Sequence, residues 1–210
     1  MQLILASSSP RRNELLALLG LVFEIYPSDF HELPSVGLSP LEQVKHFALE
    51  KAQAVAKIHP QAYVLGSDTL IELDRRLLGK PRDLADARVM LEALAGRSHH
   101  VHTAVALING EHNYEAVKVA TATVHMKPDR GELYERYLAS EESLGKAGSY
   151  AIQWLGGDLV ERIEGDYTTV VGLPLKLVAD LLQSASCQVA VNVGSLYQRR
   201  PYANWRRFAV

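Results

Sequence analysis

The first strand, turn and helix of the chain are encoded by residues 3–12, which read LILASSSPRR. The apolar run 3–6 predicts a short buried strand. Ser9 is a favoured helix N-cap, Pro10 suits the first helical position, and Gly20 ends the leucine-rich helix that follows. The sequence therefore predicts a strand, a serine-rich turn and a helix in this order.

The rest of the chain alternates further helices and strands. Cap signals and apolar spacing predict helices near 40–57, 84–95, 130–138 and 173–182. Apolar runs and an Asn109-Gly110 turn predict strands near 62–66, 100–108, 115–125, 159–163 and 168–171, with 69–73 as the continuation of the strand at 62–66 or a hairpin arm. This mixture predicts an α/β or α+β fold, either in one compact unit or in two lobes around a cleft.

Composition places the chain among globular proteins with a substantial core. Of its 210 residues, 48% are hydrophobic and 22% are charged, which excludes disordered, collagen-like and coiled-coil classes. The net charge of −2 gives no overall attraction to nucleic acid or anionic lipid. The single Cys187 excludes an internal disulfide framework and a cysteine-based zinc cluster. No apolar run is long enough for a membrane helix and no export signal is present, so we expect a soluble, cytoplasmic protein.

Residues 184–210 differ from the rest of the chain in charge, because they hold four arginines and neither lysine nor acid. We expect residues 1–183 to form one domain and 184–210 to form a flexible basic tail. The mixture of arginines with Tyr197 and Trp205 would also suit a nucleic-acid contact. A frayed or partner-bound terminus is the favoured interpretation, and we expect no stable nucleic-acid binding.

The start of the first helix is a candidate anion site. Its backbone N–H groups and positive dipole end attract anions, and the hydroxyls of Ser7, Ser8 and Ser9 precede it. Arg11 and Arg12 in the first turn oppose the helix dipole, but a bound phosphate would reverse that effect. Spacing alone leaves open a surface helix with a capping serine and solvated arginines.

Four more charged residues are candidates for a phosphate or metal site. Lys51 falls on the apolar face of its predicted helix, where it must extend toward solvent or meet an anion. Asp68 lies at the end of a buried strand, where a metal or a cation would offset its desolvation, although a turn or cap aspartate is the simpler interpretation. Glu32 could supply a second oxygen ligand, and Lys80 lies in a rigid Gly-Lys-Pro turn. Neither differs locally from an ordinary exposed residue.

His99, His100 and His102 form a histidine cluster. His100 and His102 would share one face of a strand, as two metal ligands do, but the sequence shows no third ligand nearby. We therefore favour a structural role over a histidine metal site. A serine–histidine–aspartate mechanism is set aside, because the nucleophile-elbow motif is missing.

Taken as an ordered set, six motifs resemble the Maf family of nucleoside triphosphate pyrophosphatases over about residues 3–182. They are LASSSPRR at 5–12, EKA at 50–52, GSDT at 66–69, GKP at 79–81, KAG at 146–148 and VGLPL at 171–175. The resemblance implies a two-lobed, mixed α/β fold of the Maf/ITPase-like type, with an extended mixed sheet and a central cleft, often in a homodimer. It also implies hydrolysis of a nucleoside triphosphate to the monophosphate and pyrophosphate.

The resemblance assigns the catalytic aspartate to Asp68, and phosphate-binding and other polar roles to Ser7, Arg12, Glu32, Lys51 and Lys80. Chemistry agrees with this assignment. A Mg²⁺ ion, with Mn²⁺ as the alternative, held by Asp68 and Glu32 would orient water and polarise the phosphoryl oxygens. Asp68 would act as general base, while the cationic side chains and the Ser7, Ser8 and Ser9 turn would stabilise the phosphate charge.

Three positions resemble the family branch that prefers dTTP and UTP, namely Arg11, Thr69 and Gln153. The branch that acts on 7-methyl-GTP tends to have a bulkier residue, a glutamine and an acid there. A side-chain amide can pair with the donor and acceptor edge of a pyrimidine, whereas a carboxylate favours a cationic methylated guanine. The alternative function is a nucleotide-binding regulator of septum formation and cell division. Asp68 together with both lysines favours catalysis, because a sensor needs no base.

Overall fold

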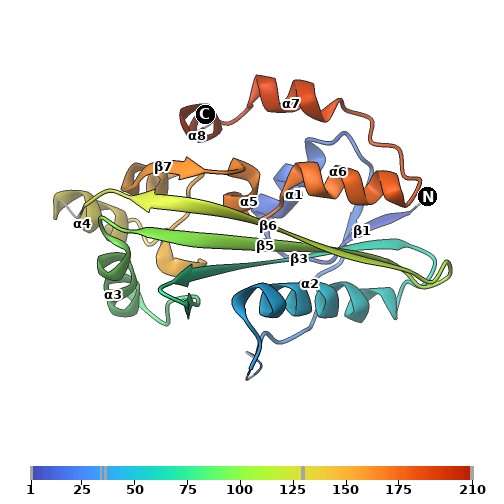
Figure 1. Ribbon diagram of the computed structural model, residues 1–210, viewed down its shortest axis with the longest axis horizontal. Coiled ribbons are helices and arrows are strands. Elements are labelled where there is room, and N and C mark those ends of the chain that lie inside the picture. The colour runs from blue at the N-terminus through green and yellow to red at the C-terminus, as the bar shows by residue number, and fades with distance from the viewer. Residues whose placement is uncertain (1, 34, 36, 129–130, 209–210) are drawn as a thin grey trace. The chain divides into compact units, whose positions relative to one another are not determined.

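The computed structural model describes residues 2–33, 35, 37–128 and 131–208 (Figure 1). The strands are β1 (Leu3–Leu5), β2 (Glu24–Ile25), β3 (Tyr63–Leu73), β4 (Arg76–Leu78), β5 (Ser98–Asn109), β6 (Tyr114–Met126) and β7 (Val160–Glu164). The α-helices are α1 (Pro10–Ala17), α2 (Pro40–Ala56), α3 (Leu84–Leu94), α4 (Glu132–Ala139), α5 (Tyr167–Val171), α6 (Leu175–Ser184), α7 (Val193–Arg199) and α8 (Ala203–Phe208). Two 3₁₀ helices are η1 (Ala147–Ser149) and η2 (Leu155–Leu159).

The strands of the described residues form one mixed sheet of seven strands. Its order is β2-β1-β3-β5-β6-β7, and β4 pairs with β3 outside this path. β1 is parallel to β2 and to β3, with Ile4 opposite Glu24 on one side and Val64 on the other. β4 and β7 pair in the antiparallel sense. The prediction of a mixed α/β fold with an extended mixed sheet is confirmed.

The chain divides into two compact units, each built from separate stretches of sequence. The first comprises Met1–Thr69, Thr103–Ala120 and Gly172–Arg199, and the second comprises Leu70–His102, Thr121–Val171 and Arg200–Val210. The predicted central cleft between two lobes stays a prediction. In the residues that the structure describes, none of the helices combines the length and apolar character needed to cross a membrane.

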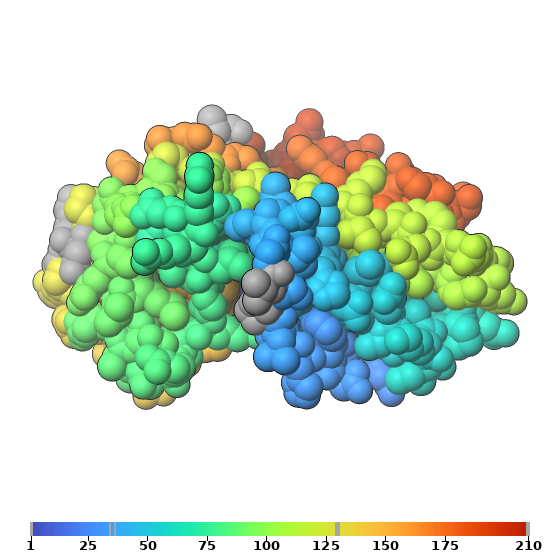
Figure 2. Space-filling view, turned by 60° about the horizontal axis from the view of Figure 1, so that its bottom comes forward, coloured from blue at the N-terminus to red at the C-terminus, as the bar shows by residue number. Residues whose placement is uncertain are grey.

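The core of the first unit is formed by β1 and β3 with the apolar faces of α1 and α2. Strand residues such as Ile4 and Leu65 are fully buried, as are Leu15 of α1 and Val44 of α2. Figure 1 shows α2 lying alongside β3, and the outer face of α2, in blue to light blue, is at the surface in Figure 2. The predicted caps are confirmed. Ser9 accepts a hydrogen bond from the Arg12 backbone N–H, and Ser39 forms a complete capping box.

One alternative is decided and one predicted element has a different form in the structure. Residues 69–73 continue the strand at 62–66, rather than forming a hairpin arm, and the resulting strand β3 passes through Asp68 without a break. The strand predicted at 168–171 is wrong, because these residues lie in helix α5. The reason is local: the Asp166 carboxylate accepts hydrogen bonds from the Thr168 backbone N–H and hydroxyl, at 3.2 and 2.5 Å, and so begins a helix.

The segment expected to be a basic tail contains helices α7 and α8. Leu196, Trp205 and Phe208 are buried, and so is the thiol of Cys187. The tail carries residues of both units, since the division falls between Arg199 and Arg200. That residues 1–183 form the domain, and that the tail is flexible, stay predictions.

Candidate functional site

Three charged side chains meet inside the first unit. The Lys51 ammonium group lies 2.5 Å from Glu32 Oε1 and 2.5 Å from Asp68 Oδ1. Lys51 is 8% exposed and Asp68 is 3% exposed, so both charges are largely removed from water. Both ion pairs are among the shortest side-chain contacts of this unit. Burying a lysine between two carboxylates costs desolvation free energy unless each charge has a partner of opposite sign. These contacts supply such partners.

The close approach of α2 to β3 brings Lys51 to Asp68. Gly66 of β3 faces α2 so closely that an added Cβ atom would lie 2.4 Å from the Ala48 carbonyl oxygen and 2.8 Å from the Ala52 nitrogen. A side chain at residue 66 would therefore force the helix away from the strand. The glycine in the Gly-Ser-Asp-Thr motif allows the backbone contact, and Asp68 follows two residues later.

Burial has the largest effect on the pKa of the Asp68 carboxyl. Burial raises the pKa of the Asp68 carboxyl, the positive charges of Lys51 and Arg12 oppose that rise, and Glu32 adds to it. Asp68 Oδ1 contacts Lys51, whereas Asp68 Oδ2 is buried without a hydrogen-bond partner. An unpartnered buried carboxylate oxygen is costly, so this atom is available to a water molecule, a metal ion or a proton.

Arg12 links the start of α1 to the same region. Its Nε donates a hydrogen bond to the Gly172 carbonyl at 2.9 Å, and its terminal nitrogens donate to Ser7 Oγ and Thr69 Oγ1, both at 3.3 Å. Burial lowers the pKa of the Arg12 guanidinium, while Asp68 and Glu32 raise it. An arginine keeps its positive charge under such pKa shifts, so Arg12 places a positive charge in a fixed position beside the carboxylates.

The polar residues around Arg12 include several that sequence reasoning missed. Ser67 Oγ donates to the carbonyls of Ala104 and Gly172, at 3.0 and 3.1 Å, and the hydroxyls of Thr69 and Thr103 lie 3.0 Å apart. Gly172 has a φ of +117°, a backbone conformation that favours glycine, and its carbonyl accepts hydrogen bonds from both Arg12 and Ser67. The Val-Gly-Leu-Pro-Leu motif was the available signal for Gly172 and the Gly-Ser-Asp-Thr motif for Ser67, whereas Thr103 requires knowledge of strand pairing.

The predicted serines differ in their surroundings. Ser7 is buried, accepts from Arg12, and also accepts a hydrogen bond from the Ser9 backbone N–H at 3.2 Å. Ser9 caps the helix, and Ser8 is exposed. Arg11 is half-buried in the same turn. The structure therefore brings together Ser7, Ser9, Arg12, Glu32, Lys51, Asp68 and Thr69 within one unit.

Two predicted site residues belong to the second unit. Lys80 is exposed in the turn after β4. Gln153 is half-buried between η1 and η2, and its Oε1 atom is buried without a hydrogen-bond partner. Their participation in the site stays a prediction.

The carboxylate pair fits a divalent cation. Asp68 Oδ1 and Glu32 Oε1 both contact the Lys51 ammonium group, whereas Asp68 Oδ2 is buried without a partner and is the oxygen that a metal ion could use. Carboxylate oxygens are the ligands that hard ions such as Mg²⁺ prefer. The donor set therefore agrees with a divalent metal ion, and it holds no thiolate or imidazole that would indicate a softer ion.

The fold and the site define a mixed α/β protein with a buried cluster of charged side chains. Comparison with known proteins gives the family. The family model described as Maf-like protein matches residues 2–185, and the chain belongs to this family, which confirms the resemblance drawn from its motifs.

Relatives and solved structures extend the comparison. The chain is 48% identical over 184 residues to a dTTP/UTP pyrophosphatase of Moorella thermoacetica, covering 86% of this chain and 93% of the relative. It is 46% identical over 193 residues to a dTTP/UTP pyrophosphatase of Shewanella oneidensis, covering 88% and 98%. A HAM1 protein from Coxiella burnetii shares the fold, with a TM-score of 0.51, 18% identity, and 88% and 99% of the two chains covered.

Proposed function

We propose that this protein hydrolyses dTTP, UTP and related or modified pyrimidine nucleoside triphosphates to the monophosphate and pyrophosphate. Its similarity to relatives named dTTP/UTP pyrophosphatase supports this activity. The observation that carries the mechanism is the buried Asp68 carboxylate, one oxygen of which contacts Lys51 while the other has no partner. The attack of water on a phosphate requires a carboxylate oxygen that can accept a proton, close to positive charges in fixed positions.

Asp68 acts as the general base of this reaction. A carboxylate of ordinary pKa is a weak base, and catalysis is most efficient when the pKa of the base lies nearer the working pH. Burial raises the pKa of Asp68 in this direction. The proton of the attacking water passes to Asp68, the oxygen bonds to the α-phosphorus, and the bond from the α-phosphorus to the bridging oxygen of the leaving pyrophosphate breaks.

The cationic residues stabilise the charge that the triphosphate carries and that the leaving pyrophosphate gains. Arg12 presents a planar guanidinium, Lys51 a point charge, and the start of α1 a set of backbone N–H groups with the hydroxyls of Ser7, Ser8 and Ser9. Lys80 is proposed to add a further charge to the phosphates. In phosphoryl transfer most of the catalysis comes from such positioning and charge stabilisation.

Asp68 and Glu32 are the residues proposed to hold a divalent metal ion, with Mg²⁺ as the first choice and Mn²⁺ as the alternative. When bound, such an ion polarises phosphoryl oxygens and makes water a better nucleophile. Lys51 contacts both carboxylates and so holds them near each other, and Asp68 Oδ2 is the oxygen that remains for an ion.

Base choice is proposed to depend on Arg11, Thr69 and Gln153. The Gln153 amide offers both a donor and an acceptor, which matches the edge of a pyrimidine base. Its buried, unpartnered Oε1 atom is an acceptor that a base could satisfy. A cytoplasmic homodimer is also proposed, on the resemblance to the family.

A panel of nucleoside triphosphates with Mg²⁺ tests the activity. We expect pyrophosphate and the monophosphate from dTTP and UTP, with much slower release from purine nucleotides. In water enriched in ¹⁸O, the label should enter the monophosphate, since water attacks the α-phosphorus. Release of inorganic phosphate and the diphosphate, or label in the pyrophosphate, would contradict the proposed reaction.

A further inference from the structure

Two histidines and a glutamate of the second unit converge on a common point. Glu72 of β3 and His100 and His102 of β5 each offer one ligand atom, and these atoms lie within 4.8 Å of one another. His102 Nε2 is 2.8 Å from Glu72 Oε2, and the rings of His100 and His102 stack with centroids 5.8 Å apart. His102 is buried while His100 is exposed, so the point is open to an ion from solvent on one side.

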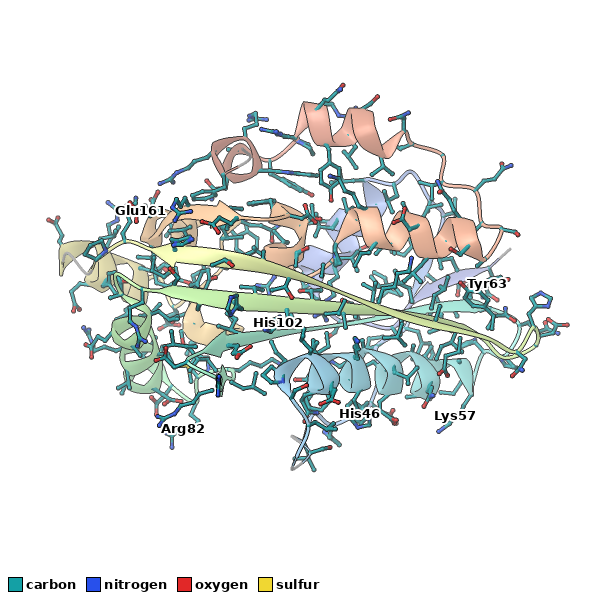
Figure 3. The ribbon with its side chains drawn as sticks, viewed as in Figure 1. His46, Lys57, Tyr63, Arg82, His102 and Glu161 are labelled. Carbon is teal, nitrogen blue, oxygen red and sulfur yellow. The ribbon has the colours of Figure 1, made fainter. Side chains whose placement is uncertain are left out.

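The second ring nitrogen of His102, Nδ1, is hydrogen-bonded to a neighbouring side chain. His102 Nδ1 lies 2.8 Å from Thr121 Oγ1, which fixes the ring so that Nε2 faces Glu72; Figure 3 marks His102 on its strand. Metal-ligating histidines are commonly oriented by such a hydrogen bond on their second nitrogen. The sequence shows two histidines on one strand face, but the glutamate comes from the neighbouring strand and is found only through strand pairing.

We propose that Glu72, His100 and His102 form a Zn²⁺ site. Two imidazoles and one carboxylate are a common three-ligand set for zinc, which leaves a fourth position for water. Imidazole ligands select zinc and similar ions over Mg²⁺, which prefers oxygen. None of these residues is among those proposed to hold the catalytic ion. A bound Zn²⁺ would join β3 to β5 and stabilise the second unit.

Zinc titration of the full chain by calorimetry, in excess Mg²⁺ to fill the carboxylate site, tests this proposal. We expect one Zn²⁺ site whose affinity falls at least about tenfold in His100→Ala and Glu72→Gln, and which persists in His112→Ala, a control at an exposed histidine. Zn²⁺ should raise the Tm of the wild type and of the control but not of His100→Ala. Equal zinc affinity in all four proteins, or no binding by the wild type, would overturn the site and leave Glu72 and His102 as a hydrogen-bonded pair.

The C-terminal segment carries a second, independent inference. Asn204 of α8 donates two hydrogen bonds from Nδ2, to the carbonyls of Ile152 and Trp154 at 2.7 and 3.1 Å. These carbonyls flank Gln153. Asn204 lies outside residues 2–185, which the family model matches, so this contact comes from sequence added beyond the family region.

Further contacts hold α8 against the same part of the second unit. The Trp205 ring is 1% exposed and stacks on Tyr167 at 5.7 Å, and Arg207 pairs with Asp158 at 2.9 Å. Gly157 leaves room for Asn204, since an added Cβ there would lie 2.4 Å from the Asn204 amide nitrogen. The backbone on both sides of Gln153 is therefore fixed by a well-packed helix.

We infer that Asn204 is a positioning residue for base selection, an inference that rests on the proposed role of Gln153. The conservative change Asn204→Asp keeps the size of the side chain but replaces its donor with an acceptor that repels both carbonyls. Asn192→Asp is the matched control, since Asn192 is exposed and caps α7 within the same C-terminal segment.

The experiment compares kcat/KM for dTTP and dGTP in the three proteins, with hydrogen exchange of the 152–157 amides as a check on the loop. We expect Asn204→Asp to lower the dTTP preference by about tenfold, mainly through KM for dTTP, while the control keeps it. Faster exchange with an unchanged dTTP preference would show a purely structural contact and overturn the inference. A wild type without pyrimidine preference would instead overturn the proposed substrate selectivity.

Discussion

The two units bury polar groups in opposite ways. In the first unit, Lys51 and Asp68 are buried as a contact of unlike charges, with Glu32 beside them. In the second unit, His99 is 2% exposed and its Nε2 lies 2.8 Å from the Tyr150 hydroxyl. Burial lowers the pKa of His99 to about 3, and burial raises the pKa of Tyr150. This pair is therefore neutral near pH 7.

In the proposed mechanism, this difference separates the reactive charges of the first unit from a structural pair in the second. A buried ion pair contributes little net stability, because desolvation offsets the attraction, and apolar residues often replace such pairs without loss. A neutral hydrogen-bonded pair avoids this cost. In the first unit, the charges lie where a triphosphate and a metal ion would interact with them. In the second unit, a neutral hydrogen-bonded pair lies where packing alone is sufficient.

Metal removal should have the largest effect on turnover, through the carboxylates of the first unit. Exhaustive chelation is expected to abolish pyrophosphate release from dTTP, because Glu32 and Asp68 would lose the ion that organises the phosphates. Adding back Mg²⁺ should restore release without Zn²⁺. Full turnover in chelator would contradict the role of these two carboxylates.

Removing the buried positive charge of Lys51 should have the second-largest effect in this series. Lys51→Met keeps much of the side-chain volume but leaves Asp68 and Glu32 without their shared cation, and we expect kcat for dTTP to fall by about 100-fold. Lys57→Met is the control, an exposed lysine at the C-cap of the same helix, marked in Figure 3. A Lys51→Met protein that is folded by circular dichroism and as active as the control would argue against a catalytic role.

The neutral pair should respond to pH through stability. The pKa of His99 is about 3 in the folded protein and 6.5 for an unperturbed histidine, with burial as the main cause and His100 and His125 adding to it. Below pH 6.5, His99 binds a proton in the unfolded chain but not in the folded chain. The free energy of unfolding therefore decreases as the pH falls toward 3. We expect this group to lower the free energy of unfolding by about 2 kcal/mol between pH 7 and pH 5.

Urea unfolding in chelator at several pH values measures this effect. His99→Gln should show a shallower decline of stability with acid than the wild type, whereas His112→Gln, at an exposed histidine, should follow the wild type. Identical slopes in all three proteins would contradict the account, because His99 would then bind its proton equally in the folded and unfolded chains.

The smallest effect is expected at Gln153. In Gln153→Glu the amide donor is lost and a negative charge is added, so preference for dTTP over purine nucleotides should fall by about tenfold with little change in stability. The ratio of kcat/KM values across the nucleotide panel gives the result. An unchanged ratio would remove Gln153 from base selection.

Local signals account for the parts of the structure that the sequence predicted well. Ser9 and Ser39 are caps whose chemistry acts within one turn, so α1 and α2 could be placed correctly. Residues 168–171 were misassigned because β-branched side chains suggested a strand, while the Asp166 cap determines a helix.

Contacts between distant segments could not be predicted in the same way. The pairing of Lys51 with Asp68 depends on the close packing of α2 at Gly66, and motif order, rather than local chemistry, indicated it. Glu72 meets His102 only because β3 and β5 are neighbours in the sheet. The contacts of Asn204 with the Gln153 loop depend on tertiary packing of residues for which we found no motif.

The central claim is that the buried Asp68 carboxylate is the base of a pyrophosphatase. The most direct measurement compares turnover of dTTP with binding of a non-hydrolysable dTTP analogue in wild type, Asp68→Asn and Asp74→Asn, whose aspartate is exposed. We predict that Asp68→Asn loses about 1,000-fold in kcat yet still binds the analogue, while Asp74→Asn behaves as wild type. Wild-type turnover in Asp68→Asn would contradict the account.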